Sequence, residues 1–325
     1  YVTNEKSITL RGIMRVIFNY KRYHKMKQPV AIALGTFDGM HRGHRELISQ
    51  LYKLKLKNGY DIMVYTFLEH PLNRLNPDKA PPQIMTIYEK MLFFNRTNID
   101  WLVLNPFDAE FASTSPKSFI EDFLLSRYNV QAIVVGYNFR FGFQREGDVQ
   151  FLKDMSQSYG FKLIVVPPIS LGGNIISSTL IRKYIQEGQI KEANSCLGAA
   201  YSIYGKVIHG YGRGKTLGFP TANLKFNLKK VIPKFGVYIT KVYVGDKKYW
   251  GVTNIGKNPT SQNQGINLET HLIDYKGKLY GKKLKIEFVH RLREEKVFSN
   301  IEDLKRQINK DINYVKNFVY KYKSI

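Results

Sequence analysis

The chain has 325 residues, of which 43% are hydrophobic and 14% aromatic, so it can form two domains with their own cores and is neither disordered nor collagen-like. Its 50 basic and 26 acidic residues give a net charge of +24, which favours anionic ligands, but the lysines are dispersed and form no nucleic-acid-binding arm. No apolar run approaches the length of a membrane span, the single cysteine, Cys196, cannot form an internal disulfide, and no Cys/His cluster has zinc-ligand spacing. These features predict a cytoplasmic protein.

From Met14 to about Gln186, short apolar runs alternate with segments of helical periodicity. Near-continuous apolar runs of this kind predict strands of a parallel sheet that is buried on both faces, at residues 30–34, 62–67, 101–104, 132–135 and 163–166. Ser115 and Pro116 have the positions of an N-cap and a first helical residue. The pattern predicts a doubly wound α/β domain, in which ligands bind at the carboxyl ends of the strands.

The first of these strands leads into a glycine-rich turn with two histidines, Gly-Thr-Phe-Asp-Gly-Met-His-Arg-Gly-His at residues 35–44, and then into a helix. Free amides at a helix N-terminus form a site for phosphate. His41 and His44 are three residues apart, so they lie on one side of the first turn and can donate hydrogen bonds to the phosphates of a triphosphate. The pattern favours this interpretation over one capping and one surface histidine.

Two further motifs follow predicted strands. His70, in Phe-Leu-Glu-His-Pro at residues 67–71, is either a ligand or a structural histidine beside a turn proline. Asn138 follows the strand at 132–135, and its amide can bind a base or a ribose edge. Phe139 and Phe141 beside it either shape a ligand site or pack in the core.

A third motif, Ser-Ser-Thr-Leu-Ile-Arg at residues 177–182, stands at a predicted helix start. The hydroxyls of Ser178 and Thr179 and the guanidinium of Arg182 can bind phosphate oxygens together. Taken alone, an ordinary serine N-cap with an exposed arginine would explain these residues. Together with the two histidines, they predict a second phosphate-binding motif.

After a short helical connector, the pattern changes near Tyr201 to short strands and frequent turns, which predicts a second domain. Gly-Lys-Thr at residues 214–216 matches the end of a P-loop, but that motif needs glycine where His209 stands, and Pro220 would interrupt its helix. The chain ends in a predicted amphipathic helix, with capping-box spacing between Ser299 and Glu302.

The stretch at 35–44 resembles the HxGH signature of nucleotidylyltransferases, and its lead-in is similar to that of the bacterial bifunctional riboflavin kinase/FAD synthetases. The resemblance implies that FMN attacks the α-phosphate of ATP directly, giving FAD and pyrophosphate, with His41, His44 and Arg182 as catalytic residues. It implies that ATP is bound by Gly35, Phe37, His41, Gly43, His44, Asn138, Ser178, Thr179 and Arg182. It implies flavin contacts from Phe139, Phe141 and Asp148.

Residues 205–223 resemble the riboflavin kinase signature, a basic glycine-rich flap followed by Gly-Phe-Pro-Thr-Ala-Asn. This resemblance implies that Gly210, Gly212 and Lys215 cover the phosphates of ATP. Thr221 and Asn223 would bind ATP and Mg²⁺, a hard ion that prefers oxygen ligands. Glu269 would be the base that takes the proton of the riboflavin hydroxyl as it attacks the γ-phosphate to give FMN, with Arg293 near the flavin.

The resemblance divides the chain into a tail or added remnant (1–13), an FMN adenylyltransferase domain (14–186), a linker (187–200) and a riboflavin kinase domain (201–325). The expected fold is a doubly wound, Rossmann-like α/β domain followed by a β-barrel with a terminal helix. We expect ATP, riboflavin and FMN as substrates, with Mg²⁺, and a monomer or weak homo-oligomer that binds neither membrane nor nucleic acid.

Two alternatives remain open. The sequence departs from the family pattern at Glu69, Leu180 and residues 143–144, which is compatible with a kinase whose adenylylation site has drifted and which makes FMN without FAD. A basic nucleic-acid-binding protein that reuses both folds would instead show binding that falls steeply with salt. No carboxylate of the N-terminal domain can be assigned as a Mg²⁺ ligand from the sequence.

Overall fold

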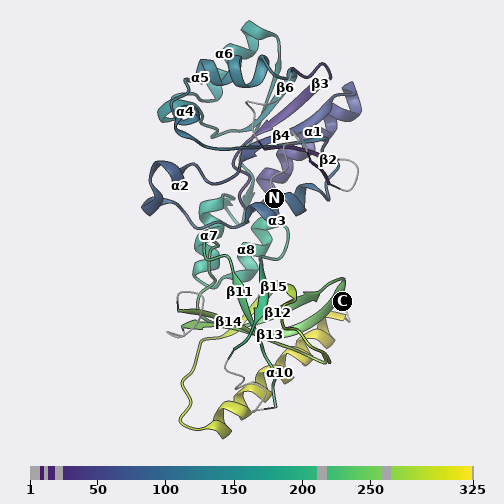
Figure 1. Ribbon diagram of the computed structural model, residues 1–325, viewed down its shortest axis with the longest axis vertical. Coiled ribbons are helices and arrows are strands. Elements are labelled where there is room, and N and C mark those ends of the chain that lie inside the picture. The colour runs from purple at the N-terminus through teal and green to yellow at the C-terminus, as the bar shows by residue number, and fades with distance from the viewer. Residues whose placement is uncertain (1–7, 11–13, 19–24, 211–217, 258–264, 324–325) are drawn as a thin grey trace. The chain divides into compact units, whose positions relative to one another are not determined.

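The computed structural model describes residues 8–10, 14–18, 25–210, 218–257 and 265–323 (Figure 1). The chain forms two compact units, unit 1 (Tyr1–Ser178) and unit 2 (Thr179–Ile325). No helix within the described ranges is long and apolar enough to cross a membrane.

Unit 1 is built on a sheet whose described strands have the order β1-β2-β5-β4-β3-β6-β7. Every neighbouring pair is parallel except β1 and β2. Because β4 and β5 lie on one side of β3 and β6 and β7 on the other, the order reverses at β3, where doubly wound folds bind ligands. The strands are β1 (Ile8–Leu10), β2 (Met14–Ile17), β3 (Pro29–Leu34), β4 (Asp61–Phe67), β5 (Trp101–Asn105), β6 (Asn129–Gly136) and β7 (Lys162–Val166).

Helices cover both faces of this sheet (Figure 1). One face packs against α1 (Arg42–Asn58) and α3 (Ile87–Phe94), and the other against α4 (Ala109–Ala112), the π-helical η3 (Phe119–Leu125) and α6 (Val149–Tyr159). Successive residues of a strand point to opposite faces, so Ile32 lies in one apolar cluster and Ala31 and Ala33 in the other. The five predicted strands and the parallel sheet are confirmed.

Short elements complete unit 1. The predicted N-cap is confirmed, because Ser115 accepts a hydrogen bond from the backbone of Ser118, and Pro116 begins the helix. The remaining short elements are α2 (Leu72–Leu75), η2 (Pro77–Lys79), α5 (Pro116–Ser118), η4 (Phe143–Arg145) and the hairpin of β8 (Ser170–Leu171) and β9 (Asn174–Ile175). Helix α7 (Ser178–Gln186) begins at the last residue of unit 1.

Unit 2 contains a barrel that the described strands close in the order β10-β11-β14-β13-β12-β15. This agrees with the predicted β-barrel. Its strands are β10 (Ser202–Ile208), β11 (Ala222–Phe226), β12 (Gly236–Val244), β13 (Lys247–Lys257), β14 (Ile266–Leu272) and β15 (Lys283–Arg293), all paired antiparallel. Helix α8 (Ile190–Leu197) precedes the barrel, where a short helical connector was predicted. Helix α10 (Ile301–Lys323) follows the barrel.

The C-terminal helix packs on the barrel through Ile312 and Val315, which cluster with Ile239. The predicted capping box of Ser299 and Glu302 is wrong. The backbone of Asp303 donates instead to the side chain of Asn300, at 2.8 Å, so the cap lies one residue later. Asparagine and serine are equally good N-cap residues. Asn300 is the N-cap of α10 because it directly precedes Ile301, the first helical residue.

Candidate functional sites

The loop between β3 and α1 brings the two predicted histidines together at the switch point of the sheet. His41 is the N-cap of α1, and its Nδ1 accepts a hydrogen bond from the backbone N–H of His44 at 3.3 Å. The two rings are stacked, with centroids 3.7 Å apart and planes 20° apart. The helix therefore starts with two imidazoles beside its first amides, an arrangement that suits an anionic ligand.

His44 is held in its neutral form. Burial, His41 and the nearby ammonium of Lys90 all lower the pKa of His44 well below its usual value. Its Nδ1 is enclosed and has no hydrogen-bond partner within the part of the chain that the structure describes. A bound phosphate would favour the charged imidazole, so His44 can respond to a triphosphate by taking up a proton.

The same loop has an unusual backbone. Phe37 and Met40 have φ values of 48° and 47°, a left-handed conformation that costs a non-glycine residue free energy, and Gly39 between them has a φ of 91°. A Cβ added at Gly39 would lie 2.9 Å from the side chain of Ile84, so glycine is required there. Phe37 is fully buried and packs against Phe94, so only its backbone can face a ligand.

Neighbouring elements hold this strained loop in place. The carboxylate of Asp38 accepts hydrogen bonds from the backbone N–H groups of Ile84 (3.0 Å) and Met85 (2.9 Å). The hydroxyl of Ser178 donates to the backbone carbonyl of Asp38 at 2.9 Å. Ser178, predicted as an ATP ligand, thus contacts the histidine loop itself. Its role toward ATP stays a prediction.

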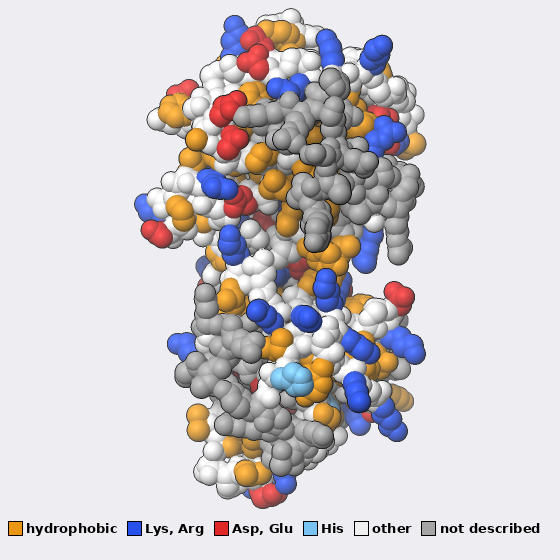
Figure 2. Space-filling model, viewed as in Figure 1, with side chains coloured by type: hydrophobic (Ala, Val, Ile, Leu, Met, Phe, Trp, Pro, Cys, Tyr) orange, Lys and Arg blue, Asp and Glu red, His pale blue; other side chains and the backbone are white. Residues whose placement is uncertain are grey.

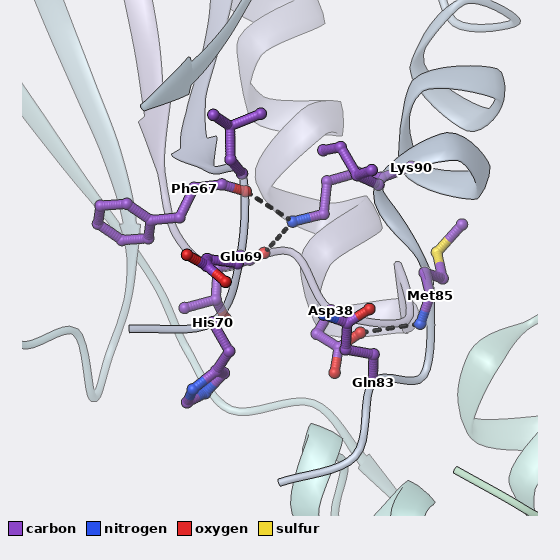
Figure 3. Close-up of a pocket in the computed structure, with 10 residues that line it drawn as sticks. Asp38, Phe67, Glu69, His70, Gln83, Met85 and Lys90 are labelled. Carbon is purple, nitrogen blue, oxygen red and sulfur yellow. Dashed lines mark hydrogen bonds between the residues drawn. The ribbon is translucent and has the colours of Figure 1, made fainter. Parts of the chain in front are cut away.

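A pocket beside the loop contains groups that the sequence did not point out (Figure 3). Lys90 enters it from α3 and is only 7% exposed. Burial lowers the pKa of Lys90 to about 8, although Asp38 acts in the opposite direction. The pocket is lined by Thr36, Asp38, Phe67, Leu68, Glu69, His70, Gln83, Met85, Ile87 and Lys90. The sequence offered no distinctive signal for Lys90, because its partners Thr36 and Thr66 are far away in sequence.

The turn after β4 contains His70 in a structural position. The Nδ1 of His70 accepts a hydrogen bond from the backbone N–H of Leu72 at 3.2 Å, at the start of α2. Glu69, which replaces the family's proline, forms an ion pair with Arg74 at 2.8 Å. Both side chains thus have local partners in this turn.

The residues predicted to bind the base and the flavin follow β6. Asn138 is exposed, as a ligand-binding amide would need to be. Phe141 is 8% exposed and belongs to the core cluster, while Phe139 is partly buried and stacks on it at 5.5 Å. Asp148 is the N-cap of α6, with its carboxylate 2.9 Å from the backbone N–H of Phe151. A flavin contact from Asp148 stays a prediction.

The remaining residues of the second phosphate motif belong to unit 2. Thr179 is exposed in the first turn of α7, and Arg182 lies one turn later and is partly buried. Together they leave a hydroxyl and a guanidinium on the first turns of one helix, in the order that the sequence predicted.

In unit 2, the predicted kinase residues meet on neighbouring strands. Asn223 of β11 pairs with Glu269 of β14, and Glu269 pairs with Asn254 of β13. The amide of Asn267 donates to the Glu269 carboxylate at 2.6 Å. The adjacent residues on β11 are buried, so Asn223 and its paired neighbours lie on the outer face of the barrel. We call Asn223, Glu269 and Asn254 the outer rung.

Gly210, the last described residue before the predicted flap, approaches this rung. A Cβ added at Gly210 would lie 2.1 Å from the amide nitrogen of Asn223, so a larger residue here would displace the Asn223 side chain. Gly212 and Lys215, predicted to cover ATP, lie outside the described residues. Thr221 directly precedes β11 and is partly buried.

The oxygen atoms of Thr221 and Asn223 fit a hard cation, because Mg²⁺ is often held by a few protein oxygens together with the phosphates of its nucleotide. The described residues contain no group of three or more His, Cys, Asp or Glu side chains that could hold a metal ion. A Mg²⁺ ion held by Thr221 and Asn223 would complete its coordination with phosphate oxygens of the nucleotide and with water.

Arg293 and Asn254 form contacts that the sequence did not predict. The guanidinium of Arg293 forms an ion pair with Asp311 of α10, at 2.8 Å from Nη2 and 3.1 Å from Nε. A flavin contact from Arg293 stays a prediction. Asn254 donates to Glu295 at 3.3 Å, which links the outer rung to the segment after β15. Sequence alone assigned no role to Asn254 or Glu295.

Family models match nearly the whole chain. One described as FAD synthetase matches residues 23–180, and one described as riboflavin kinase matches residues 197–319. A crystal structure described as a macrolide-efflux protein from Streptococcus pneumoniae superposes with a TM-score of 0.85 at 31% identity, and covers 94% of this chain and 99% of that one. The two chains thus share their fold over almost their full lengths.

Relatives named bifunctional riboflavin kinase/FMN adenylyltransferase are similar over most of the chain. That of Buchnera aphidicola subsp. Schizaphis graminum is 37% identical and covers 94% of this chain and 99% of its own length. Those of Escherichia coli K12 and Bacillus subtilis 168 are 36% and 35% identical, and cover 86% and 92% of this chain and 90% and 96% of their own lengths. The chain belongs to the family of bifunctional riboflavin kinase/FMN adenylyltransferases.

Proposed function

We propose that the two activities of this enzyme, phosphorylation of riboflavin and adenylylation of FMN, take place at two separate sites. The stacked pair of His41 and His44 at the start of α1 carries the assignment of the adenylylation site. The outer rung carries that of the kinase site. We assign residues 14–186 to the adenylyltransferase domain, 187–200 to a linker and 201–325 to the kinase domain.

In adenylylation, a phosphate oxygen of FMN attacks the α-phosphorus of ATP. The bond from that phosphorus to the bridging oxygen breaks, and pyrophosphate leaves. His41 and His44 donate hydrogen bonds to the phosphates and stabilise the charge that develops on them. Backbone amides of the loop bind ATP. No covalent enzyme intermediate is required.

In riboflavin phosphorylation, Glu269 accepts the proton of the terminal ribityl hydroxyl while its oxygen attacks the γ-phosphorus of ATP, and ADP leaves. The hydrogen bond from Asn267 orients the Glu269 carboxylate. Thr221 and Asn223 would hold Mg²⁺, which neutralises charge on the phosphates of ATP when it is bound. The close approach of Gly210 to Asn223 supports a role of the flap backbone beside these phosphates.

We propose that the enzyme acts in the cytoplasm as a monomer or weak homo-oligomer that does not bind nucleic acid. On the face in Figure 2, Lys and Arg side chains are spread over both units among acidic and apolar side chains. The charge of +24 is thus compatible with attraction of ATP and FMN. Retention on a DNA column that falls steeply with salt would contradict this proposal.

Single substitutions separate the two sites. We expect His44→Ala to slow FMN adenylylation roughly 100- to 1000-fold, because it removes a donor to the phosphates. We expect Glu269→Gln to slow riboflavin phosphorylation roughly 100- to 10,000-fold, because it removes the base. Each variant should keep the other activity and so serves as the control for its counterpart. Loss of both activities in either folded variant would contradict the assignment of two sites.

A further inference from the structure

Lys90 is a buried cation that the two reactions described above do not use. Its Nζ lies 2.8 Å from the carbonyl oxygen of Thr36 and 3.3 Å from the hydroxyl of Thr66. It also lies 3.5 Å from the carbonyl oxygen of Phe67 (Figure 3). Thr36 follows β3, whereas Thr66 and Phe67 end β4. One ammonium, with three N–H groups, thus joins the ends of two neighbouring strands.

The hydroxyl of Thr66 completes this connection. It donates to the same carbonyl oxygen of Thr36 at 3.0 Å and is itself fully buried. Thr36 is therefore held twice, directly before the strained residue Phe37, and the strained residue Met40 lies in the same loop. Backbone strain of this kind persists only where the surroundings fix it, and Lys90 is part of what fixes it.

The charge of Lys90 also matters at the histidines. Asp38, Glu69 and His70 are the other titratable groups that line its pocket. Asp38 is already bonded to backbone N–H groups, so it does not neutralise Lys90 as a simple ion pair would. The positive charge of Lys90 contributes to the lowered pKa of His44. Lys90 therefore affects the catalytic loop in two ways. Its hydrogen bond to Thr36 holds the backbone, and its positive charge lowers the pKa of His44.

The pocket is poorly suited to a ligand of its own. The ammonium of Lys90 and the carboxylate of Asp38 are both occupied by protein partners. Two carboxylates at the wall, from Asp38 and Glu69, oppose an anion. A buried charge costs free energy unless it forms hydrogen bonds or ion pairs. The hydrogen bonds of Lys90 to backbone carbonyl oxygens therefore account for a lysine at this position.

We propose that Lys90 is a positioning residue of the adenylylation site, which fixes the β3–α1 loop against the end of β4 so that His41 and His44 meet the phosphates of ATP. The proposal rests on the proposed role of the two histidines. A displacement of about 1 Å in reacting groups can slow an enzyme roughly 100-fold, so loss of this support should be visible in catalysis.

The test uses the full chain with Lys90→Met, which keeps the length of the side chain and removes its charge and donors. Lys90→Arg keeps the charge, and Lys153→Met makes the same change at an exposed position of α6. For each variant, kcat and KM for ATP and FMN are measured in adenylylation, riboflavin phosphorylation is measured in the same preparation, and the pKa of His44 is followed by NMR. Thermal unfolding identifies the temperature range in which unit 1 stays folded.

We expect Lys90→Met to lower kcat for adenylylation roughly 100-fold below its unfolding temperature, to leave riboflavin phosphorylation unchanged and to raise the pKa of His44. Lys90→Arg should recover part of kcat, and Lys153→Met should behave as the unchanged enzyme. If Lys90→Met does not fold, Thr66→Val removes one support of the same carbonyl and should lower kcat in the same direction, by a smaller factor.

The outcomes separate this proposal from the one on which it rests. If His44→Ala abolishes adenylylation but folded Lys90→Met and Thr66→Val keep their full kcat, Lys90 has no positioning role. If His44→Ala itself keeps full adenylylation, the histidine site is wrong, whatever Lys90 does. A loss in Lys90→Met that only follows the unfolded fraction, with an unchanged kcat for the folded enzyme, would show that the lysine serves stability alone.

Discussion

Replacement of Asp311 by alanine should loosen the C-terminal helix from the barrel. Asp311 accepts hydrogen bonds from Nε and Nη2 of Arg293 at 2.8–3.1 Å, and the two side chains are only 5% and 17% exposed. Removal of one partner of a buried ion pair leaves the other charge without compensation, which costs about 3–5 kcal/mol. With a urea m-value of roughly 2 kcal/mol/M, the midpoint of unfolding should fall by roughly 1.5–2.5 M.

Tryptophan fluorescence provides the assay. The chain has two tryptophans, and Trp250 of the barrel contacts Phe318 of α10 edge to face, with ring centroids 6.1 Å apart. In a Trp101→Phe background, Trp250 alone reports on whether α10 is docked. Glu302→Ala is the control, because its side chain is 75% exposed on the same helix, and it should change stability by no more than about 0.5 kcal/mol.

The double variant Arg293→Leu/Asp311→Leu distinguishes an anchor from a flavin ligand. Apolar replacement of both partners removes the buried charges and should restore most of the stability. Restored stability with a raised KM for riboflavin would show that Arg293 also contacts the flavin, as the family resemblance implies. The reasoning about the anchor is refuted if Asp311→Ala shifts the midpoint no more than Glu302→Ala does.

Three further predictions concern the adenylylation loop and the metal. Gly39→Ala should destabilise unit 1 by about 1–3 kcal/mol, because the φ of Gly39 is 91° and the new Cβ would meet Ile84. The change should slow adenylylation but not phosphorylation. Urea unfolding and assays of both activities measure these effects. The pKa of His44 is lowered in the folded state, so the unfolded state binds a proton at this residue first as the pH falls below about 6.5. The unfolding temperature of unit 1 should therefore drop between pH 7.5 and 5.5. The drop should be smaller in His44→Gln. EDTA should stop riboflavin phosphorylation reversibly, and Mg²⁺ should restore it; full activity without divalent ions would contradict the role of Thr221 and Asn223.

Local patterns in the sequence were sufficient for most of the fold. The five predicted strands of unit 1 could be found because the inner strands of a parallel sheet require continuous apolar runs, as Ile32 and its alanine neighbours illustrate. The edge strand β7 has such a run but is only partly buried. The cap of α10 was misplaced because Ser299 and Asn300 are both good N-caps, and only the observed backbone distinguishes them. Element boundaries of this kind depend on packing that a short window does not contain.

In the candidate sites too, residues of local motifs could be predicted, whereas residues whose partners are distant in sequence could not. His41, His44, Asn223 and Glu269 were predicted as site residues from local motifs and from the family resemblance, and the structure brings each pair together. Their roles stay predictions. Lys90 could not, because its partner Thr36 is 54 residues away and an isolated lysine in a helix has no distinctive pattern. Ser178 illustrates the same limit, since its contact with Asp38 spans 140 residues.

A time course of flavin products shows whether both sites are active in one chain. The purified chain is incubated with riboflavin, ATP and Mg²⁺, and the flavins are separated by chromatography over time. The account predicts that FMN appears first and that FAD follows at the expense of FMN. FMN that accumulates without FAD, under conditions in which unit 1 is folded, would contradict an active adenylylation site, and unchanged riboflavin would contradict the kinase site.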